Sequence, residues 1–220
     1  MILSAAMSID GYLDDASPER LLLSNTEDLD RVDEVRAGVD AILVGANTIR
    51  RDNPRLLVNS TERRTARLTR GLPEYPLKVT VTKTGSLDES ANFWHSGGER
   101  LVLTVDGTAA ELADRFKGLA DVVSVGLEFH WGAALDELGR RGVRRLLVEG
   151  GGTIHTQLMA SDLADELHLA IAPLLVGDPA APRLLGPAQF PGGSTSRMRL
   201  VESRTVGDVV FIRYAPKDRP

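Results

Sequence analysis

The sequence predicts an α/β fold in which a mostly parallel central sheet is flanked by helices and ends in antiparallel strands. Up to about residue 160, short apolar runs that suit buried strands alternate with longer segments of helical periodicity. After that point, three strand-like segments follow one another without a helix between them. With 220 residues, 42% of them hydrophobic, we expect a single domain over residues 1–220.

Short apolar runs bounded by turn residues identify the expected strands. The first covers residues 2–9 and ends at an Asp-Gly turn. The strands expected in the helix-alternating part cover residues 41–44, 77–82, 101–105, 122–125 and 145–148. The late strands cover residues 166–172, 198–203 and 209–214, the last two joined by a Gly-Asp turn.

Helices are expected where capping residues precede apolar positions spaced three or four residues apart. Residues 24–27 have the spacing of a capping box, and a helix of about three turns follows before Gly38. A second capping box at residues 108–111 opens another helix. Further helices are expected after Gly45, over residues 132–141 and over residues 153–160.

Composition excludes several classes of protein. The chain has no cysteine, which excludes disulfides, thiol nucleophiles and a zinc site built on cysteine. Its four histidines lie at no spacing that suits a metal site on one helix, and we expect no metal. No apolar run reaches the roughly 18 residues of a membrane span, and the first residues lack the basic segment of a signal peptide. We therefore expect a cytoplasmic protein that binds no membrane.

Charge is unevenly distributed along the chain. The net charge of −5 argues against a nucleic-acid partner. Residues 50–70 nevertheless hold seven arginines and two acidic residues, so this stretch carries +5. Residues 59–76 are polar and interrupted by glycine and proline, and we expect a long loop there. The arginines either form a local anion site or face water, and the sequence leaves both interpretations open.

The strongest local signal is the run of glycines at residues 150–152, which follows a buried strand and opens a helix. Glycines let the backbone approach an anion closely, and the first N–H groups of a helix favour phosphate. No lysine follows at the helix start, so a Walker-type nucleotide site is excluded. A tight turn without a ligand is the alternative. Glu149, at the end of the strand, suits either the N–H groups of a heterocycle or a structural role near the helix dipole.

Polar residues near two other strands are weaker candidates. Thr48 and Asp52 share one face of the helix after Gly45 and suit a polar ligand, with capping and surface ion pairs as the alternative. Asp10 follows the first strand, where Asp-Gly is common turn chemistry. Arg36 lies in the last turn of the first helix, where a cation suits the helix dipole.

Several segments, taken together and in order, resemble the riboflavin-biosynthesis pyrimidine reductase family. They are Ser-Ile-Asp-Gly at residues 8–11, Arg36 with residues 40–45, Thr48 with Asp-Asn-Pro-Arg-Leu at residues 52–56, Glu-Gly-Gly at residues 149–151, and residues 165–173 with Gly177. The resemblance implies a dihydrofolate-reductase-like fold. It also implies that NADPH reduces a ribosylaminopyrimidine 5′-phosphate, through hydride transfer to a ring-opened imine that leaves a ribityl chain. In many bacteria this reductase is fused to a zinc deaminase, and we expect only the reductase half here.

The resemblance also implies roles for individual residues. The residues expected to contact NADPH are Ala6, Thr48, Asp52, Gly150, Gly151, Gly152, Thr153 and Ile154. The residues expected to contact the substrate are Arg36, Leu56 and Glu149. Asp52, Asp10 or an ordered water is expected to supply the proton. A homodimer is also implied, with residues 166–172 and the late strands as its interface.

Two positions depart from the family pattern. Tyr12 stands where the family commonly has Lys or Arg, and Asn59 where it often has an arginine for the substrate phosphate. Arg55, Arg63 and Arg64 are candidates to replace that arginine. Two other functions therefore stay open: a dihydrofolate-reductase-like NADPH reductase of another heterocycle, and a nucleotide-binding relative without catalysis.

Overall fold

The computed structural model describes residues 1–216 of the chain, which divides into two compact units. Unit 1 comprises Met1–Val32 and the chain from Val148 onward, and unit 2 comprises Asp33–Leu147. The two boundaries fall inside helix α1 (Thr26–Ala37) and strand β6 (Leu146–Val148). Each unit has its own ladder of strands.

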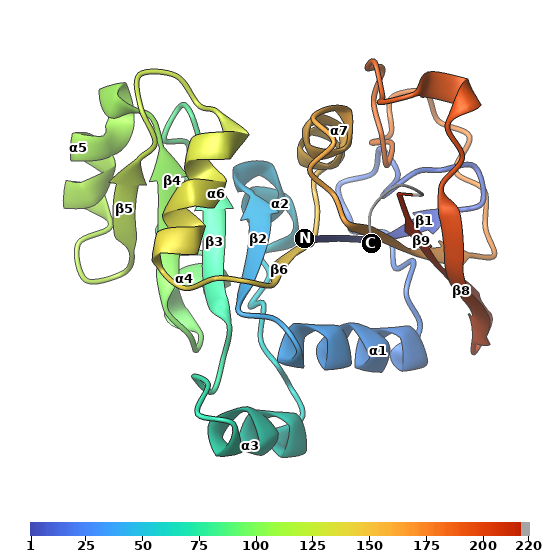
Figure 1. Cartoon of the computed structure of the whole chain (residues 1–220), viewed down its shortest axis with the longest axis horizontal. Helices are drawn as coiled ribbons and strands as arrows, with labels where there is room; N and C mark the ends of the chain where they lie inside the picture. The colour runs from blue at the N-terminus through green and yellow to red at the C-terminus, as the bar shows by residue number, and fades with distance from the viewer. Residues whose placement is uncertain (217–220) are drawn as a thin grey trace. The chain divides into compact units, whose positions relative to one another are not determined.

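Unit 2 is built on four parallel strands. These are β2 (Ala41–Gly45), β3 (Leu77–Val81), β4 (Arg100–Thr104) and β5 (Asp121–Ser124), each paired with the next in parallel register. Every residue of β2 is buried, as expected for an apolar strand inside a parallel sheet. Figure 1 shows the four strands side by side, with their labels in chain order.

Helices connect these strands, because parallel neighbours need a crossover. The connecting helices are α2 (Ala46–Asp52), α3 (Thr61–Thr69), α4 (Asn92–His95) and α5 (Asp106–Arg115), and α6 (Trp131–Arg140) follows β5 and leads to β6. The helices contribute their few large side chains to the core: Phe93 and Trp94 of α4 are buried, and Trp94 packs against Phe116 just after α5.

Unit 1 combines one parallel and two antiparallel pairings. Strand β1 (Ile2–Ser8) is parallel to β7 (Glu166–Ala172), which is antiparallel to β9 (Val209–Ala215), which is antiparallel to β8 (Arg199–Val206). The hairpin between β8 and β9 turns through two residues, and Gly207 adopts the positive φ of 59° that such turns favour. Helix α7 (Gly152–Ala160) and the short helix η1 (Gly193–Thr195) complete the described part of this unit.

The mostly parallel pairing, the flanking helices and the antiparallel C-terminal strands confirm the predicted α/β class. The prediction of a long loop over residues 59–76 is wrong, because nine of these residues form helix α3. Ser60 caps that helix by accepting a hydrogen bond from the Arg63 amide at 3.2 Å. The first helix is capped by Asn25, whose side chain accepts from the Asp28 amide at 2.8 Å, and not by Ser24.

Helix α1 buries charge where its sequence suggested apolar contacts. Asp28 and Arg31 are buried and form an ion pair of 2.7 Å, whereas Leu29 is 56% exposed. The Arg31 guanidinium lies 4.2 Å from the ring centroid of Phe211 in β9, which gives it a cation–π partner. The packing of α1 in unit 1 therefore rests on a charged pair and an aromatic ring.

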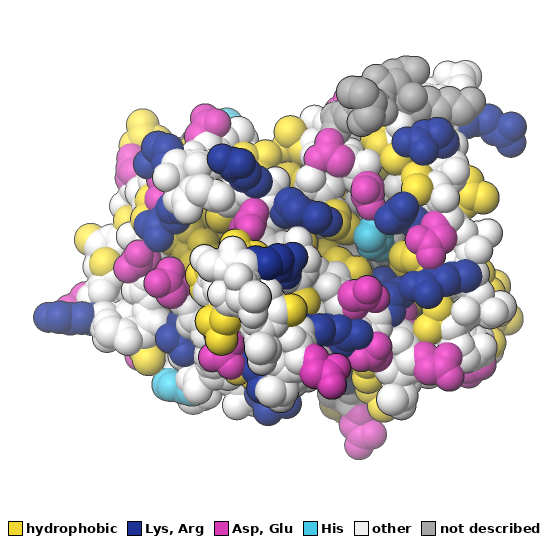
Figure 2. Space-filling view, turned by 60° about the horizontal axis from the view of Figure 1, so that its bottom comes forward, with side chains coloured by type: hydrophobic (Ala, Val, Ile, Leu, Met, Phe, Trp, Pro, Cys, Tyr) yellow, Lys and Arg dark blue, Asp and Glu magenta, His cyan; other side chains and the backbone are white. Residues whose placement is uncertain are grey.

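Figure 2 shows basic and acidic side chains interspersed on one face of the molecule, without a large field of one sign. Among the described residues, no helix has the length and hydropathy needed to cross a membrane. Residues 1–216 also contain no group of three or more His, Asp or Glu side chains placed to hold a metal ion.

Candidate active site

The glycine turn between β6 and α7 has the geometry that its sequence predicts. Gly150 and Gly151 have φ values of 127° and 87°, a backbone conformation that side chains disfavour. A Cβ atom on Gly152 would lie 2.2 Å from the Arg183 carbonyl oxygen, so the backbone of residues 183–184 packs directly on this glycine. Gly151 is the N-cap of α7 and supplies no side-chain hydrogen bond to the first turn of the helix. This arrangement suits a phosphate bound by backbone N–H groups.

The side chain of His155 accepts a hydrogen bond from the backbone of the glycine turn. Its ring is fully buried, and Nε2 accepts a hydrogen bond of 3.4 Å from the Gly150 amide. Burial lowers the pKa of His155 to about 4. The imidazole is therefore neutral at physiological pH, with its proton on Nδ1, and it is the acceptor that the turn requires. The sequence alone offered His155 no partner, because this contact depends on the fold of the turn.

The remaining candidates in unit 1 lie in or just after strands. Glu149 follows β6 and is half-buried, with its own polar contact. Ala6 lies in β1 opposite Ala170 of β7. Tyr12, at the position where the related family has a basic residue, is buried and accepts a hydrogen bond of 2.6 Å from Arg183, whose guanidinium also lies over its ring.

Asp10 is held as an acceptor at the turn after β1. Its carboxylate accepts hydrogen bonds from the Ser8 hydroxyl at 2.6 Å and from the amides of Val176 and Gly177 at 3.1 and 2.8 Å. The bond from Ser8 is the main reason that the pKa of Asp10 is lowered. The carboxylate therefore stays ionised near neutral pH and anchors the segment at 176–177.

The candidates in unit 2 lie on α2 and on the segment that follows it. Thr48 and Asp52 are half-buried on one face of α2, as their spacing predicts, while Ile49 faces the core. Asn53 ends the helix in the left-handed conformation. Leu56 also has a positive φ, of 49°, and is only 3% exposed.

Arg36 contacts the segment of unit 2 that contains Leu56. Arg36, in the last turn of α1, donates a hydrogen bond of 3.0 Å to the carbonyl oxygen of Leu57. Two of the three residues expected to contact the substrate therefore lie in or next to one segment. Arg36 helps to fix the backbone of that segment. Glu149, the third, belongs to unit 1.

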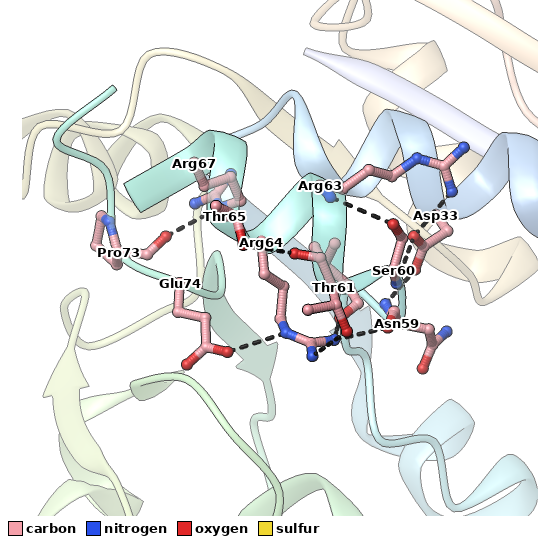
Figure 3. A network of polar contacts seen from close by, with 11 residues as sticks. Asp33, Asn59, Ser60, Thr61, Arg63, Arg64, Thr65, Arg67, Pro73 and Glu74 are labelled. Atoms are coloured by element: carbon pink, nitrogen blue, oxygen red, sulfur yellow. Dashed lines mark hydrogen bonds and ion pairs between the residues drawn. The ribbon is translucent and has the colours of Figure 1, made fainter. Parts of the chain in front are cut away.

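The arginines of α3 have structural partners (Figure 3). Arg63 forms a 3.0 Å ion pair with buried Asp33, which also accepts from the amides of Asn59 and Ser60. Arg64 pairs with Glu74 at 2.9 Å and donates to the carbonyl oxygens of Val58 and Asn59. Through these contacts Arg63 and Arg64 stabilise residues 58–60 and the loop after α3.

Of the candidates to replace the missing phosphate arginine, Arg55 stands apart. Its side chain is exposed, next to Leu56 and outside the network of α3. Arg64, by contrast, uses both terminal nitrogens and Nε on partners within unit 2. Arg55 is the candidate with the greatest freedom to reach an anion.

Comparison with solved structures shows the fold, and a family model shows the family. The chain superposes on a pyrimidine reductase-like protein from Corynebacterium diphtheriae with a TM-score of 0.79 at 21% identity, covering 99% of this chain and 92% of that one. The fold is thus the dihydrofolate-reductase-like fold of the pyrimidine reductases. The RibD C-terminal domain family matches residues 1–212, and the chain belongs to this family.

Two relatives align over most of their length. A protein of Archaeoglobus fulgidus named 2,5-diamino-6-ribosylamino-4(3H)-pyrimidinone 5′-phosphate reductase is 35% identical over 191 residues, covering 86% of this chain and 87% of that protein. A protein of the same name from Methanothermobacter thermautotrophicus is 29% identical over 221 residues, covering 99% and 98%.

Proposed function

We propose that this protein reduces a ribosylaminopyrimidine 5′-phosphate with NADPH, in the riboflavin pathway. The observation that carries the proposal is the full-length similarity to relatives named for this reductase. Membership of the RibD C-terminal domain family over residues 1–212 supports the same conclusion. The names of these relatives favour the 2,5-diamino-4-pyrimidinone substrate, and the corresponding aminouracil is the alternative within the class.

The proposed reaction converts the ribosyl group into an open ribityl chain. The sugar ring of the ribosylamine opens to give an imine. This imine joins the exocyclic amino nitrogen on the pyrimidine to C1 of the sugar. NADPH, when bound, supplies a hydride to C1, and one proton reaches the nitrogen, so that the imine is reduced by two electrons and the cofactor becomes NADP⁺. The chain must hold the reacting carbons about 3 to 3.5 Å apart and keep water away.

The residues proposed to bind the cofactor fit a phosphate and a polar ligand. We assign the phosphates to the backbone of Gly150, Gly151, Gly152, Thr153 and Ile154, because the N-terminus of α7 has no side-chain cap. Ala6, Thr48 and Asp52 are proposed to contact the rest of NADPH. The preference for NADPH over NADH belongs to this proposal.

The residues proposed to bind the substrate are Arg36, Leu56 and Glu149. The carboxylate of Glu149 suits the N–H groups of the pyrimidine. Arg55 is proposed to contact the 5′-phosphate, because it is exposed beside Leu56 while Arg63 and Arg64 are committed elsewhere.

Asp52 is the side chain that we propose for the proton route. Asp10 was the other carboxylate expected from the sequence, but its lowered pKa favours the ionised acceptor that anchors residues 176–177. Full turnover by an Asp52→Asn variant would assign the proton to an ordered water instead.

The proposed function is tested by NADPH oxidation with the purified protein. The substrates are the 2,5-diamino-pyrimidinone and the aminouracil ribosylamino phosphates, with dihydrofolate as the unrelated heterocycle and NADH as the control cofactor. We expect turnover with at least one ribosylamino phosphate and none with dihydrofolate. Binding of NADPH without turnover on any ribosylamino phosphate would contradict the proposal.

A reductase of another heterocycle is the second candidate, and Asn59 favours it. This position lacks the arginine that the related family often uses for the substrate phosphate, and Asn59 instead gives its backbone amide to Asp33. Reduction of dihydrofolate, or of a substrate without phosphate, in preference to the ribosylamino phosphates would support this candidate.

We also propose a cytoplasmic homodimer with no nucleic-acid partner. One face of the β7, β9 and β8 ladder carries Leu169, Ile171 and Ile212, together with the exposed Val210 and Leu200 (42% and 52%). Such an apolar sheet face suits a second copy of the chain. A monomer by light scattering at micromolar concentration would contradict the dimer.

The net charge of −5 and the mixed charges in Figure 2 support the proposal that the protein has no nucleic-acid partner.

A further inference from the structure

Unit 2 buries a lysine that has no part in the assignments above. Lys78 lies in β3 with a side chain that is fully buried. An ammonium group removed from water is stable only where its N–H donors meet acceptors. The acceptors around Lys78 therefore indicate what the charge holds in place.

Four oxygen atoms surround the Lys78 ammonium. Nζ donates to the carbonyl oxygens of Phe93 and Ser96, the latter at 2.9 Å. It also lies 3.0 Å from the Ser96 hydroxyl and 3.3 Å from the carbonyl oxygen of Arg55. One end of this cluster is the short helix α4 and the residue after it, and the other end is the segment that follows α2.

The same two segments are joined by further hydrogen bonds. The Ser96 hydroxyl lies 3.1 Å from the Arg55 carbonyl oxygen and 2.6 Å from the Asn92 carbonyl oxygen, and its one proton is shared between these two acceptors. The Asn92 amide donates to the Asn53 side chain at 2.6 Å. Lys78, Ser96 and Asn92 thus hold residues 53–56 at both ends.

Residues 53–56 need such support because the backbone at Leu56 is strained. Leu56 has a φ of 49°, whereas the φ of 43° at Asn53 is ordinary for an asparagine that ends a helix. A branched side chain such as leucine disfavours the left-handed region, and a residue stays there only when its surroundings fix it. The contacts of Arg55 and Asn53 supply that constraint.

We propose that Lys78 is a positioning residue of the reductase, whose ammonium, together with Ser96, fixes residues 53–56 so that Leu56 is held in place for the pyrimidine substrate. The inference rests on the proposed function of Leu56 and deepens it. Lys78 itself touches neither substrate nor cofactor in this scheme. It acts through the carbonyl oxygen of Arg55.

We call the contacts of Lys78 and Ser96 with the Arg55 carbonyl oxygen the Lys78 clamp. The electrostatic surroundings of Lys78 make this clamp sensitive to pH. Burial, together with the nearby positive charge of Arg100 in β4, lowers the pKa of Lys78 to about 7. The other titratable groups on the packed elements are His95 of α4, which contacts the Glu89 carbonyl oxygen, and Arg55, whose side chain is exposed. Below pH 7 the ammonium offers three donors to its oxygens. Above pH 7 the amine has lost one donor, so residues 53–56 are held less firmly.

The test compares Lys78→Met and Ser96→Ala with the control variant Arg115→Met. In Lys78→Met, the methionine fills the volume of the lysine stem without a charge. Ser96→Ala removes the contact between the Ser96 hydroxyl and the Arg55 carbonyl oxygen without leaving Lys78 with no acceptor. Arg115 is a matched control, because it donates to two carbonyl oxygens of a neighbouring loop, Gly85 and Leu87, and not to residues 53–56. Two readouts are measured: steady-state kinetics, and the rate of trypsin cleavage after Arg55, followed by fragment mass.

Both test variants should raise KM for the ribosylaminopyrimidine phosphate roughly tenfold, with kcat and KM for NADPH changed less than about twofold. The wild-type KM for this substrate should rise from pH 7 to pH 8, and that of Lys78→Met should stay flat. Cleavage after Arg55 should become faster in both test variants and stay unchanged in Arg115→Met.

Other outcomes separate the two claims. An unchanged rate of cleavage after Arg55 in both test variants would overturn the claim that Lys78 and Ser96 fix residues 53–56. This holds whether or not the activity of the variants changes. Faster cleavage with an unchanged substrate KM would overturn the positioning role while the proposed function stands. A wild-type protein that reduces no ribosylaminopyrimidine phosphate would overturn the proposed function and the positioning role together.

Discussion

At the scale of single residues, buried polar side chains hold this protein's loops through backbone atoms. Lys78 donates to the Arg55 carbonyl oxygen, buried Arg67 donates to carbonyl oxygens at and just after the end of α1, and His155 accepts from the Gly150 amide. Each of these side chains satisfies backbone groups that would otherwise be buried without partners. Removing one therefore costs more than the hydrogen bond itself.

His155 predicts how stability depends on acid. Its pKa is about 4 in the folded protein and near its ordinary value of 6.5 in the unfolded chain. Between these values the unfolded state binds more protons, so the free energy of unfolding falls as the pH drops from about 6.5 to 4. The loss from this residue should approach about 3 kcal/mol. Urea unfolding of the wild type and of His155→Gln across this range measures it.

The His155→Gln variant should show a clearly weaker acid dependence than the wild type. His168 is also buried, and burial lowers its pKa, but it titrates in both proteins and cancels in the comparison. Parallel stability curves for the two proteins would show that His155 is not buried in its neutral form.

Gly152 predicts the effect of a single added methyl group. A Cβ there would approach the backbone oxygen of Arg183 to 2.2 Å, which requires the turn to move. Gly152→Ala should lower the free energy of unfolding by about 2 kcal/mol and weaken NADPH binding. Gly139→Ala is the matched control, since its Cβ meets nothing within 4 Å inside α6, and it should be neutral or stabilising by about 0.5 kcal/mol. Equal responses of the two variants would contradict the close packing at Gly152.

At the scale of elements, Arg67 of α3 stabilises the C-terminal end of α1 by hydrogen bonds to its backbone. This guanidinium is 1% exposed and donates to the carbonyl oxygens of Ala37, Val39 and Pro73 at 3.0, 2.8 and 2.9 Å. Arg67→Met should therefore destabilise the protein by about 3 kcal/mol in urea unfolding. Arg70→Met removes an exposed arginine of the same segment and should cost less than about 1 kcal/mol. A cost below 1 kcal/mol for Arg67→Met would mean that α3 is not held by this residue.

The elements that the sequence predicted are those with apolar periodicity. The strands and the helices α5, α6 and α7 fall within a few residues of their expected positions, because their core faces are apolar. Helix α3 could not be found in this way, since its only buried residue is Arg67. The buried face of α1 likewise carries Asp28 and Arg31 in place of leucines. Buried charge is invisible to a hydrophobic pattern.

At the scale of the whole molecule, the glycine turn was the part of the candidate site that physical reasoning alone favoured. Its strand, its positive φ angles and its uncapped helix follow from the sequence of three glycines. Arg36 and Leu56 were selected by resemblance, and their adjacency depends on the carbonyl of Leu57, which no spacing rule predicts. Lys78 was missed because a lysine in an apolar strand gives no sign of the carbonyls that converge on it.

The proposed reaction transfers a hydride from NADPH to C1 of the sugar of a ribosylaminopyrimidine phosphate. The most direct test uses NADPH labelled with deuterium at the transferable position of nicotinamide C4, with the product analysed by mass spectrometry and NMR. We expect a ribitylamino product that carries the deuterium at C1 of the ribityl chain. A product without deuterium, or no ribityl product while NADPH is bound, would contradict it.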